Sequence, residues 1–433
     1  MKALVGLLFL LQVITVANAQ RVCASEIYSQ KLLSSNSSVK SGWNKAEAQI
    51  AATLKAASSF AARDTTSNET IYLPVVIHIV YNKNIENISD AQAKSQLKVL
   101  NDDYGNSNID KINIPGVFAP LAADTKIKFC LAQVDPQGRK TGGIVRKNTT
   151  KEYFSPEDGM KSSVQGGDDA WDSKRYLNIW VCNMSGRTMG YSSLPGGPAN
   201  VDGVVISYDV FGSGENVRSP FNKGRTTTHE IGHWLGLKHI WGDAICGTDL
   251  VEDTPTQQYY NYGCPTFPHV SNCSPNTNGD MFMNFMDFTN DGCMNMFTIG
   301  QKQRMRALFA KGNLRNSFLL SFACDSTLAQ GSALPIADTI PVVTVTTTIP
   351  AKQSAGLKVY PNPTQSIVNI EYINTINSNP KTISIFNVVG TRVYIGQLNR
   401  EKASVNMVNF AKGIYIVQIE EGGNKLTSKI IKQ

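Results

Sequence analysis

The sequence predicts an α+β domain, in which a twisted sheet lies over a metal-binding helix, followed by a small all-β sandwich. Three observations support this fold class. Strand-like and helical patterns alternate through most of the chain. The short segment THEIGHWLGLKH contains three of the five histidines. The segment 357–433 is a run of alternating apolar and polar residues without histidine or cysteine, as expected of a small sandwich.

The α+β domain is expected to begin with strands and helices that precede the histidine-rich segment. β-Branched and aromatic residues predict strands at 69–82, 126–135, 175–184 and 202–212, and the last of these should line the cleft beside the metal helix. Helical spacing predicts helices at 43–58, at 89–106 with Ser89 as N-cap, and at 298–312. His78, in the first strand, and His269, in a Pro-rich loop, are interpreted as structural residues.

Length and composition limit the class of protein. A chain of 433 residues is too long for one ordinary domain, and 42% hydrophobic with 17% charged residues is typical of a folded globular protein. The net charge of +7 is modest, and the 41 basic residues form no run. We therefore expect no nucleic-acid partner.

The N-terminus has the pattern of an export signal. A lysine precedes an apolar run, and the small residues Ala17-Asn18-Ala19 follow it, so cleavage after Ala19 is expected. No later segment is apolar for long enough to span a bilayer. We expect an exported, soluble protein and a monomer, in which the eight cysteines favour disulfides.

The histidine-rich segment has the spacing of a metal site. His229 and His233 are four residues apart, so both rings project from one helix face. Gly236 is expected to end the helix, and His239 then returns toward the first two rings. A lone histidine on a helix is usually a hydrogen-bonded core residue, but the full spacing HExxHxxGxxH favours zinc with an open fourth position.

The residue beside the first histidine completes a hydrolytic site. Zinc with three protein ligands lowers the pKa of its bound water to about 7. Glu230 is placed to take the proton of that water and pass it to the leaving amine. The pattern predicts amide hydrolysis without a covalent intermediate, on protein or peptide substrates.

The long histidine motif, together with NFMDF around Met286, resembles the metzincin clan of zinc peptidases. The segments WGDAICGTDLVEDTP, NYGC, NGDMFMNFMDFTNDGC and FTIGQKQRM resemble the pappalysin family, in particular its ulilysin-like members, over about Tyr72 to Cys324. The resemblance implies a metzincin-like α+β domain. It also implies that His229, His233 and His239 are zinc ligands, Glu230 the general base and Met286 the methionine of the turn beneath the metal.

The resemblance further implies two interlaced disulfides and a bound calcium ion. Carried over, the disulfides pair Cys246 with Cys273 and Cys264 with Cys293, whereas the sequence by itself leaves the other pairings open. Asp249, the carbonyl of Val251 and Asp253 offer the hard oxygen donors that calcium takes. A solvated acidic loop is the alternative interpretation of these three residues.

Two positions depart from the family pattern. Many metzincins have a tyrosine two residues after the turn methionine, where this chain has Phe288, which has no hydroxyl to donate to an oxyanion. Relatives that cleave beside Arg or Lys have an acidic residue directly before the last cysteine of the disulfide pair. This chain has Gly292 there, with Asp291 one position earlier, so a preference for basic residues stays open.

Cys23, just inside the expected mature N-terminus, predicts latency. A thiolate is a good zinc ligand, and ulilysin-like zymogens use a propeptide cysteine against the metal. The alternative is a disulfide from Cys23 to Cys130, Cys182 or Cys324. Arg63 is the expected point of maturation.

The sandwich begins LKVYPNPT and resembles the sorting domain of the type IX secretion system, with a carbohydrate-binding or adhesive module as the alternative. We therefore expect a protein that the type IX machinery exports to the medium or the cell surface. The expected segments are a signal peptide at 1–19, a propeptide at 20–63, a zinc peptidase domain at 64–325, a linker at 326–356 and the sorting domain at 357–433.

These observations predict a secreted zinc endopeptidase that is made as a zymogen. The alternative from another class is a surface adhesin or binding protein that keeps a peptidase fold without turnover. The intact Glu230 and three histidines argue against it, because a binding protein has no need of a proton shuttle.

Overall fold

The computed structural model describes residues 22–58, 69–214, 216–273, 278–321, 323–325, 356–373, 381–387, 392–398, 402–421 and 424–433. The expected signal peptide, Arg63 and almost all of the expected linker lie outside these ranges. The chain divides into two compact units. One comprises the residues up to Ala132 with Thr141–Asn316, and the other Gln133–Lys140 with Ser317–Gln433.

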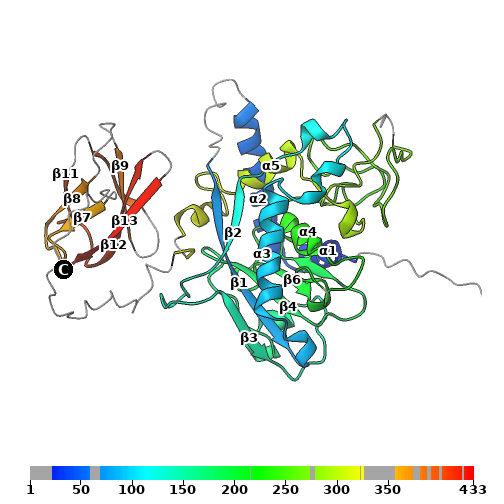
Figure 1. The fold of residues 1–433 in the computed structure, drawn as a ribbon, viewed down its shortest axis with the longest axis horizontal. Coiled ribbons are helices and arrows are strands. Elements are labelled where there is room, and N and C mark those ends of the chain that lie inside the picture. Colours follow the sequence, from blue (N-terminus) through cyan, green and yellow to red (C-terminus); the bar gives the residue numbers. More distant parts are fainter. Residues whose placement is uncertain are drawn as a thin grey trace, which may run out of the picture. The chain divides into compact units, whose positions relative to one another are not determined.

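The first unit is built around a twisted six-stranded sheet (Figure 1). Its strands are β1 (Ile71–Tyr81), β2 (Ile127–Leu131), β3 (Ile144–Asn148), β4 (Leu177–Cys182), β5 (Gly190–Ser192) and β6 (Val204–Ser207). The order is β2-β1-β4-β6-β5, and β3 pairs with β1 beyond the end of β2. All pairs are parallel except β5 with β6.

One prediction about this sheet is wrong. The strand at 202–212 was expected to line the cleft, but β6 lies between β4 and β5. The short β5 is the edge strand instead. It begins with Gly190, and a Cβ on this residue would lie 3.0 Å from Cγ of Glu230. The glycine therefore lets the edge of the sheet approach the metal helix.

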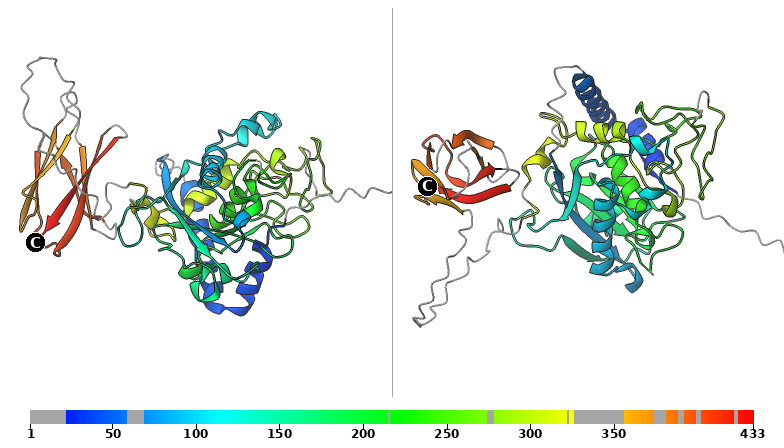
Figure 2. Two further views of the ribbon diagram at one scale, coloured as in Figure 1. Left: turned by 60° about the horizontal axis from the view of Figure 1, so that its bottom comes forward. Right: turned by 45° about the horizontal axis from the view of Figure 1, so that its top comes forward.

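The helices of this unit lie against the sheet and against one another (Figures 1 and 2). They are α1 (Ser25–Ser35), α2 (Ser37–Ser58), α3 (Asp90–Tyr104), α4 (Arg225–Trp234) and α5 (Ile299–Ala307). α3 packs against β2 and α4, and α2 packs against α5. The predicted cap of α3 is confirmed, because Ser89 Oγ accepts from Gln92 N at 3.1 Å. α1 was not predicted, and its weak amphipathic pattern explains why.

Short 3₁₀ segments connect these elements. They are η2 (Asn84–Glu86), η3 (Ile109–Asn113), η4 (Ala119–Leu121), η5 (Gly159–Lys161), η6 (Ser163–Gln165), η7 (Ala199–Val201), η8 (Tyr208–Val210), η9 (Asp291–Cys293) and η10 (Asn316–Leu320). Within the described part of the chain, no helix is both apolar and long enough to cross a bilayer.

The second unit contains the predicted β-sandwich. One sheet has the order β10-β9-β12-β13 and the other β11-β8-β7. The strands are β7 (Gly356–Tyr360), β8 (Ile367–Ile373), β9 (Lys381–Asn387), β10 (Arg392–Leu398), β11 (Lys402–Asn406), β12 (Gly413–Glu421) and β13 (Asn424–Lys432). Residues such as Val368, Ile370, Ile383, Ile385 and Val417 form a core of its own.

Disulfides join Cys246 to Cys273 and Cys264 to Cys293, the interlaced arrangement that the family resemblance implies. Cys130 and Cys324 are also disulfide-bonded. Cys23 and Cys182 are free thiols, and both are buried. The alternative of a disulfide at Cys23 is therefore wrong.

Candidate metal centre

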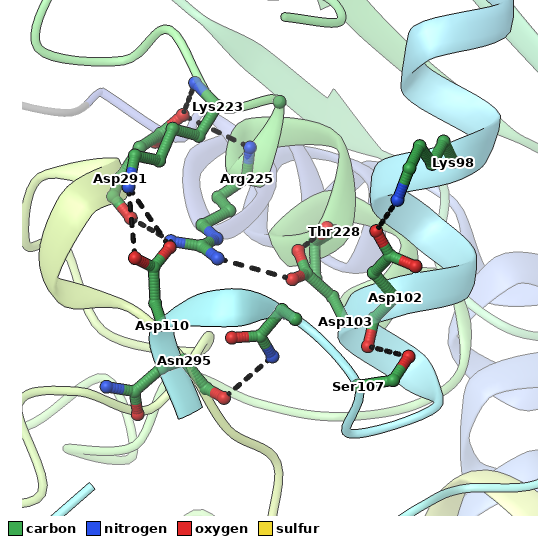
Figure 3. A network of polar contacts seen from close by, with 12 residues as sticks. Lys98, Asp102, Asp103, Ser107, Asp110, Lys223, Arg225, Thr228, Asp291 and Asn295 are labelled. Carbon is green, nitrogen blue, oxygen red and sulfur yellow. Dashed lines mark hydrogen bonds and ion pairs between the residues drawn. The ribbon is translucent and has the colours of Figure 1, made fainter. Parts of the chain in front are cut away.

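A buried network of charges fixes the beginning of α4 (Figure 3). The Asp291 carboxylate accepts from the backbone N–H groups of Lys223, at 2.8 Å, and Arg225, at 3.2 Å. The Arg225 guanidinium in turn lies 2.6 Å from the Asp110 carboxylate and 3.5 Å from that of Asp103. Capping and ion pairing hold the first turn of the helix in place. Asp291 is fully buried in this role.

The three histidines of the motif converge through their Nε2 atoms. His229 and His233 lie one turn apart on α4, and the chain then bends at Gly236, whose φ is 84°. His233 Nε2 lies 3.1 Å from Nε2 of His229 and 3.1 Å from Nε2 of His239. Gly236 thus has the conformation that the sequence predicted for the end of the helix.

The outer nitrogen of each ring has an acceptor. The Nδ1 partners are the Phe285 carbonyl for His229 at 2.7 Å, the Leu237 carbonyl for His233 at 2.9 Å, and the Asp243 carboxylate for His239. A neutral ring that donates from Nδ1 has a lone pair on Nε2. Three such rings would point three lone pairs at one another. Burial, and then the neighbouring His239, lower the pKa of His233 to about 3. Neutral rings in this arrangement fit a shared cation, and the donor set fits zinc.

Glu230 points to the same place and is fully buried. Its Oε2 accepts from Ser25 Oγ at 2.7 Å and lies 3.5 Å from Cys23 Sγ. Both partners belong to the segment before α1 or to its first turn. The segment expected to be the propeptide therefore contacts the carboxylate expected to be the general base.

Cys23 lies among the metal-binding atoms. Its Sγ and one ring nitrogen of each motif histidine all lie within 4.8 Å of one another. The backbone around it extends the sheet, since Met189 N donates to the Val22 carbonyl and Ala24 N to the Gly190 carbonyl, both at 2.9 Å. Burial, followed by the Glu230 charge, raises the pKa of the Cys23 thiol. A thiolate at this position is stable only beside a cation.

The turn containing Met286 lies directly beneath α4. A Cβ on Gly232 would lie 2.5 Å from Met286 Sδ, so glycine permits the close approach. Asn284 Oδ1 accepts from Met286 N at 2.9 Å and shapes the turn. Phe288 packs against the metal histidines, with its ring centroid 4.9 Å from that of His239.

The two aspartates of the acidic loop after the metal segment, Asp249 and Asp253, have different environments. The Asp253 carboxylate accepts from Thr298 Oγ1 at 2.6 Å and from Gly300 N at 2.8 Å, so it caps α5. Asp249 is buried and accepts from Val251 N at 3.1 Å. Burial raises the pKa of Asp249 to about 7. Of the three expected calcium ligands, Asp253 is therefore already occupied as a cap of α5.

Sequence reasoning missed several partners of the site. These are Ser25, Asp243 and the carbonyls of Leu237 and Phe285. Asp243 carried a usable signal, because it follows His239 by four residues. The other three are set by backbone geometry or by contacts between distant parts of the chain. The expected structural role of His78 fits its buried contacts with Asp168 and Asn178.

A triad of histidines with converging Nε2 atoms and a neighbouring buried glutamate, beside the edge of a mixed sheet, defines the class of zinc metallopeptidases. The family profile described as pregnancy-associated plasma protein-A matches residues 160–310, and a profile of secretion-system C-terminal sorting domains matches residues 358–433. The chain belongs to this pappalysin family of metallopeptidases and ends in a type IX sorting domain.

Individual relatives agree with this assignment. An extracellular metalloprotease of Pyricularia oryzae is 31% identical over 231 residues, which are 52% of this chain and 69% of the relative. Mature mirolysin of Tannerella forsythia in complex with a cleaved peptide is 48% identical, with a TM-score of 0.58 over 61% of this chain and 99% of that one. A promirolysin mutant from the same organism is 44% identical, with a TM-score of 0.65 over 72% of this chain and 100% of that one. The protein is a secreted metalloendopeptidase made as a zymogen.

Proposed function

We propose that this zymogen is a zinc endopeptidase in which His229, His233 and His239 hold the metal, Glu230 is the general base and Cys23 closes the site. The observation that carries the proposal is the convergence of the three Nε2 atoms and the Cys23 sulfur within 4.8 Å. Zinc supplies a Lewis acid and lowers the pKa of bound water to about 7 when it occupies such a site.

Glu230 would hold and transfer the proton. Its Oε2 is the oxygen that Ser25 and Cys23 contact, so their departure leaves this oxygen free to accept from a water. The same carboxylate would then pass this proton to the leaving amine. The adhesin alternative is not favoured, since it gives this buried carboxylate no role.

β5 would position the substrate backbone. In the latent protein, the Gly190 carbonyl accepts from Ala24 N, and Met189 N, directly before β5, donates to the Val22 carbonyl. A peptide that replaces the propeptide can add to the same edge, as in β-strand addition. Catalytic residues and this edge both lie in the first compact unit.

Three finer assignments belong to the proposal. The propeptide is assigned to 20–63, with cleavage at Arg63, which agrees with α1 and α2 covering the site. The peptidase, linker and sorting segments are assigned the bounds given in the sequence analysis. A calcium ion would bind Asp249 and the Val251 carbonyl in place of the Thr254 hydroxyl, which lies 2.9 Å from each of these groups. The protein would act as a monomer.

The test combines a casein zymogram, with and without chelator, and metal analysis of two variants. Glu230→Ala should keep zinc and lose all but a few percent of turnover, because it deletes the base and no ligand. His239→Ala should instead lower the zinc content. Full turnover by Glu230→Ala, or activity that chelator does not affect, would overturn the proposal.

A further inference from the structure

The propeptide helix α1 inserts a tyrosine into the catalytic domain. It lies on the sheet face of Tyr191, opposite the face on which Gly190 approaches Glu230. Tyr28 is 4% exposed, and its hydroxyl donates to Asp158 Oδ2 at 2.5 Å. Its ring lies 4.7 Å from that of Tyr191, between centroids. Lys161 Nζ lies 5.5 Å from the same ring centroid. Both the hydroxyl and the ring of Tyr28 therefore contact the catalytic domain.

The pocket that receives Tyr28 is formed by contacts among residues of the catalytic domain. Asp158 Oδ1 accepts from Tyr191 OH and from Lys161 Nζ, both at 2.9 Å. Lys161 Nζ also donates to the Val201 carbonyl at 2.9 Å, and its side chain is fully buried. The Trp180 ring lies 5.3 Å from the same ammonium. None of these contacts includes a residue of α1, so we expect the pocket to keep its shape when α1 leaves.

Loss of the propeptide would remove one hydrogen-bond donor to Asp158 and expose the aromatic residues that Tyr28 covers. Asp158 Oδ2 loses the Tyr28 hydroxyl, and the apolar surface under Ala24 and Tyr28 meets solvent. An exposed aromatic patch is unfavourable in water, and the Asp158 oxygen remains available as a hydrogen-bond acceptor. The site thus favours a new occupant with a ring and a hydroxyl donor.

The pocket lies beside the position where a substrate backbone is held. Tyr191 is the residue after Gly190 on β5, and Gly190 forms the main-chain bridge with Cys23. Side chains alternate across a strand, so a peptide on this edge directs every second side chain toward the face of Tyr191. This step depends on the proposed function, because it takes β5 as the substrate-binding edge.

We propose that the pocket of Asp158, Lys161, Trp180 and Tyr191, called here the Tyr28 pocket, is a substrate subsite of the activated enzyme that selects a tyrosine side chain. The Lys161 ammonium attracts the electron-rich ring and repels a lysine or arginine. The Asp158 carboxylate accepts from the phenol hydroxyl, which phenylalanine lacks. In the latent protein, Tyr28 of α1 fills this subsite.

The first experiment needs no variant. Activated enzyme, cut between α2 and β1, is profiled with peptides that carry Tyr, Phe, Lys or Ala at each position flanking the cleaved bond. At one position, kcat/KM for Tyr should exceed that for Phe by about tenfold, as expected for a hydrogen bond to a charged acceptor, with Lys below both. Equal rates for Tyr and Phe at every position would overturn the subsite.

A matched pair of variants locates the effect. Asp158→Asn should bring the Tyr-to-Phe ratio close to one. Glu157→Gln, one residue away, changes an exposed carboxylate whose side chain contacts Lys31 and Ser155, and should keep the wild-type ratio. The same change of ratio in both variants would contradict the assignment. An enzyme that cleaves no peptide would instead refute the proposed function, so the two failures are distinguishable.

Discussion

The Sγ atom of Cys23 lies 3.5 Å from Oε2 of Glu230, although the two residues are 207 positions apart. Ser25 donates to the same oxygen at 2.7 Å. One short segment therefore reaches both the metal position and the carboxylate that would activate water. The proposed latency would act on both functional groups at once, and removal of the segment would free both.

The first prediction concerns this contact. Cys23→Ala should show activity before cleavage and mature faster, because a tethered ligand has an effective concentration of about millimolar or more and its loss opens the metal. A maturation time course measures both effects. Cys182→Ala is the control, since it removes the other free, buried thiol, which lies in β4. Unchanged latency in Cys23→Ala would rule the switch out.

A second prediction concerns the network in Figure 3. Arg225→Met should destabilise the protein by about 3–5 kcal/mol, because it leaves the buried Asp103 carboxylate without its cation. Lys98→Met removes the exposed pair with Asp102 and should cost no more than about 0.5 kcal/mol. Denaturant titration of both variants measures the difference. Similar losses in the two would show that the buried pairs do not hold α4.

The third prediction links calcium to pH. The pKa of Asp249 is raised to about 7 by burial, so in the folded protein this carboxyl is mostly neutral below that pH. Its ionisation opposes folding as pH rises from about 4 to 7, and a bound cation would offset that cost. Added calcium should therefore raise Tm more at about pH 8 than at about pH 5.5. Asp249→Asn should remove this difference, and an equal calcium effect at both pH values would exclude Asp249 as a ligand.

Phe288 provides a fourth prediction. The ring packs against His239 and Tyr260, and the metzincin resemblance implies a tyrosine at its position. Phe288→Tyr should raise kcat by about tenfold by adding a hydroxyl donor for the oxyanion. Phe288→Leu, which adds no donor, should give no increase. An unchanged kcat in Phe288→Tyr, with a loss in Tyr260→Phe, would show that Tyr260 already supplies the donor.

The fifth prediction concerns the sorting domain. Deletion of residues 357–433 should leave a folded, active peptidase, because the sandwich has its own core and holds none of the site residues. The truncated protein should stay in the periplasm of its native host. Activity assays on purified protein and cell fractionation measure the two outcomes. Loss of activity in the purified truncated protein would show that the sandwich completes the enzyme.

Much of the metal centre was predictable because its signals are local. A four-residue spacing places His229 and His233 on one helix face in any helix, and a glycine permits the bend that returns His239. The strands β1, β2, β4 and β6 were visible from their β-branched and aromatic residues, and the sandwich from its two-residue period, whereas β3 and β5 were not predicted. Resemblance to a family, rather than spacing, supplied the disulfide pairing and the role of Met286.

Only the tertiary structure decided which strand forms the edge, which acceptors orient the rings and what the propeptide covers. Whether β5 or β6 forms the edge depends on how the strands pair, and the composition of a single strand does not predict this pairing. The contacts of Glu230 with Ser25 and of Asp158 with Tyr28 join residues 205 and 130 positions apart. Such contacts form only when the whole chain has folded, because no periodicity along the sequence relates residues so far separated.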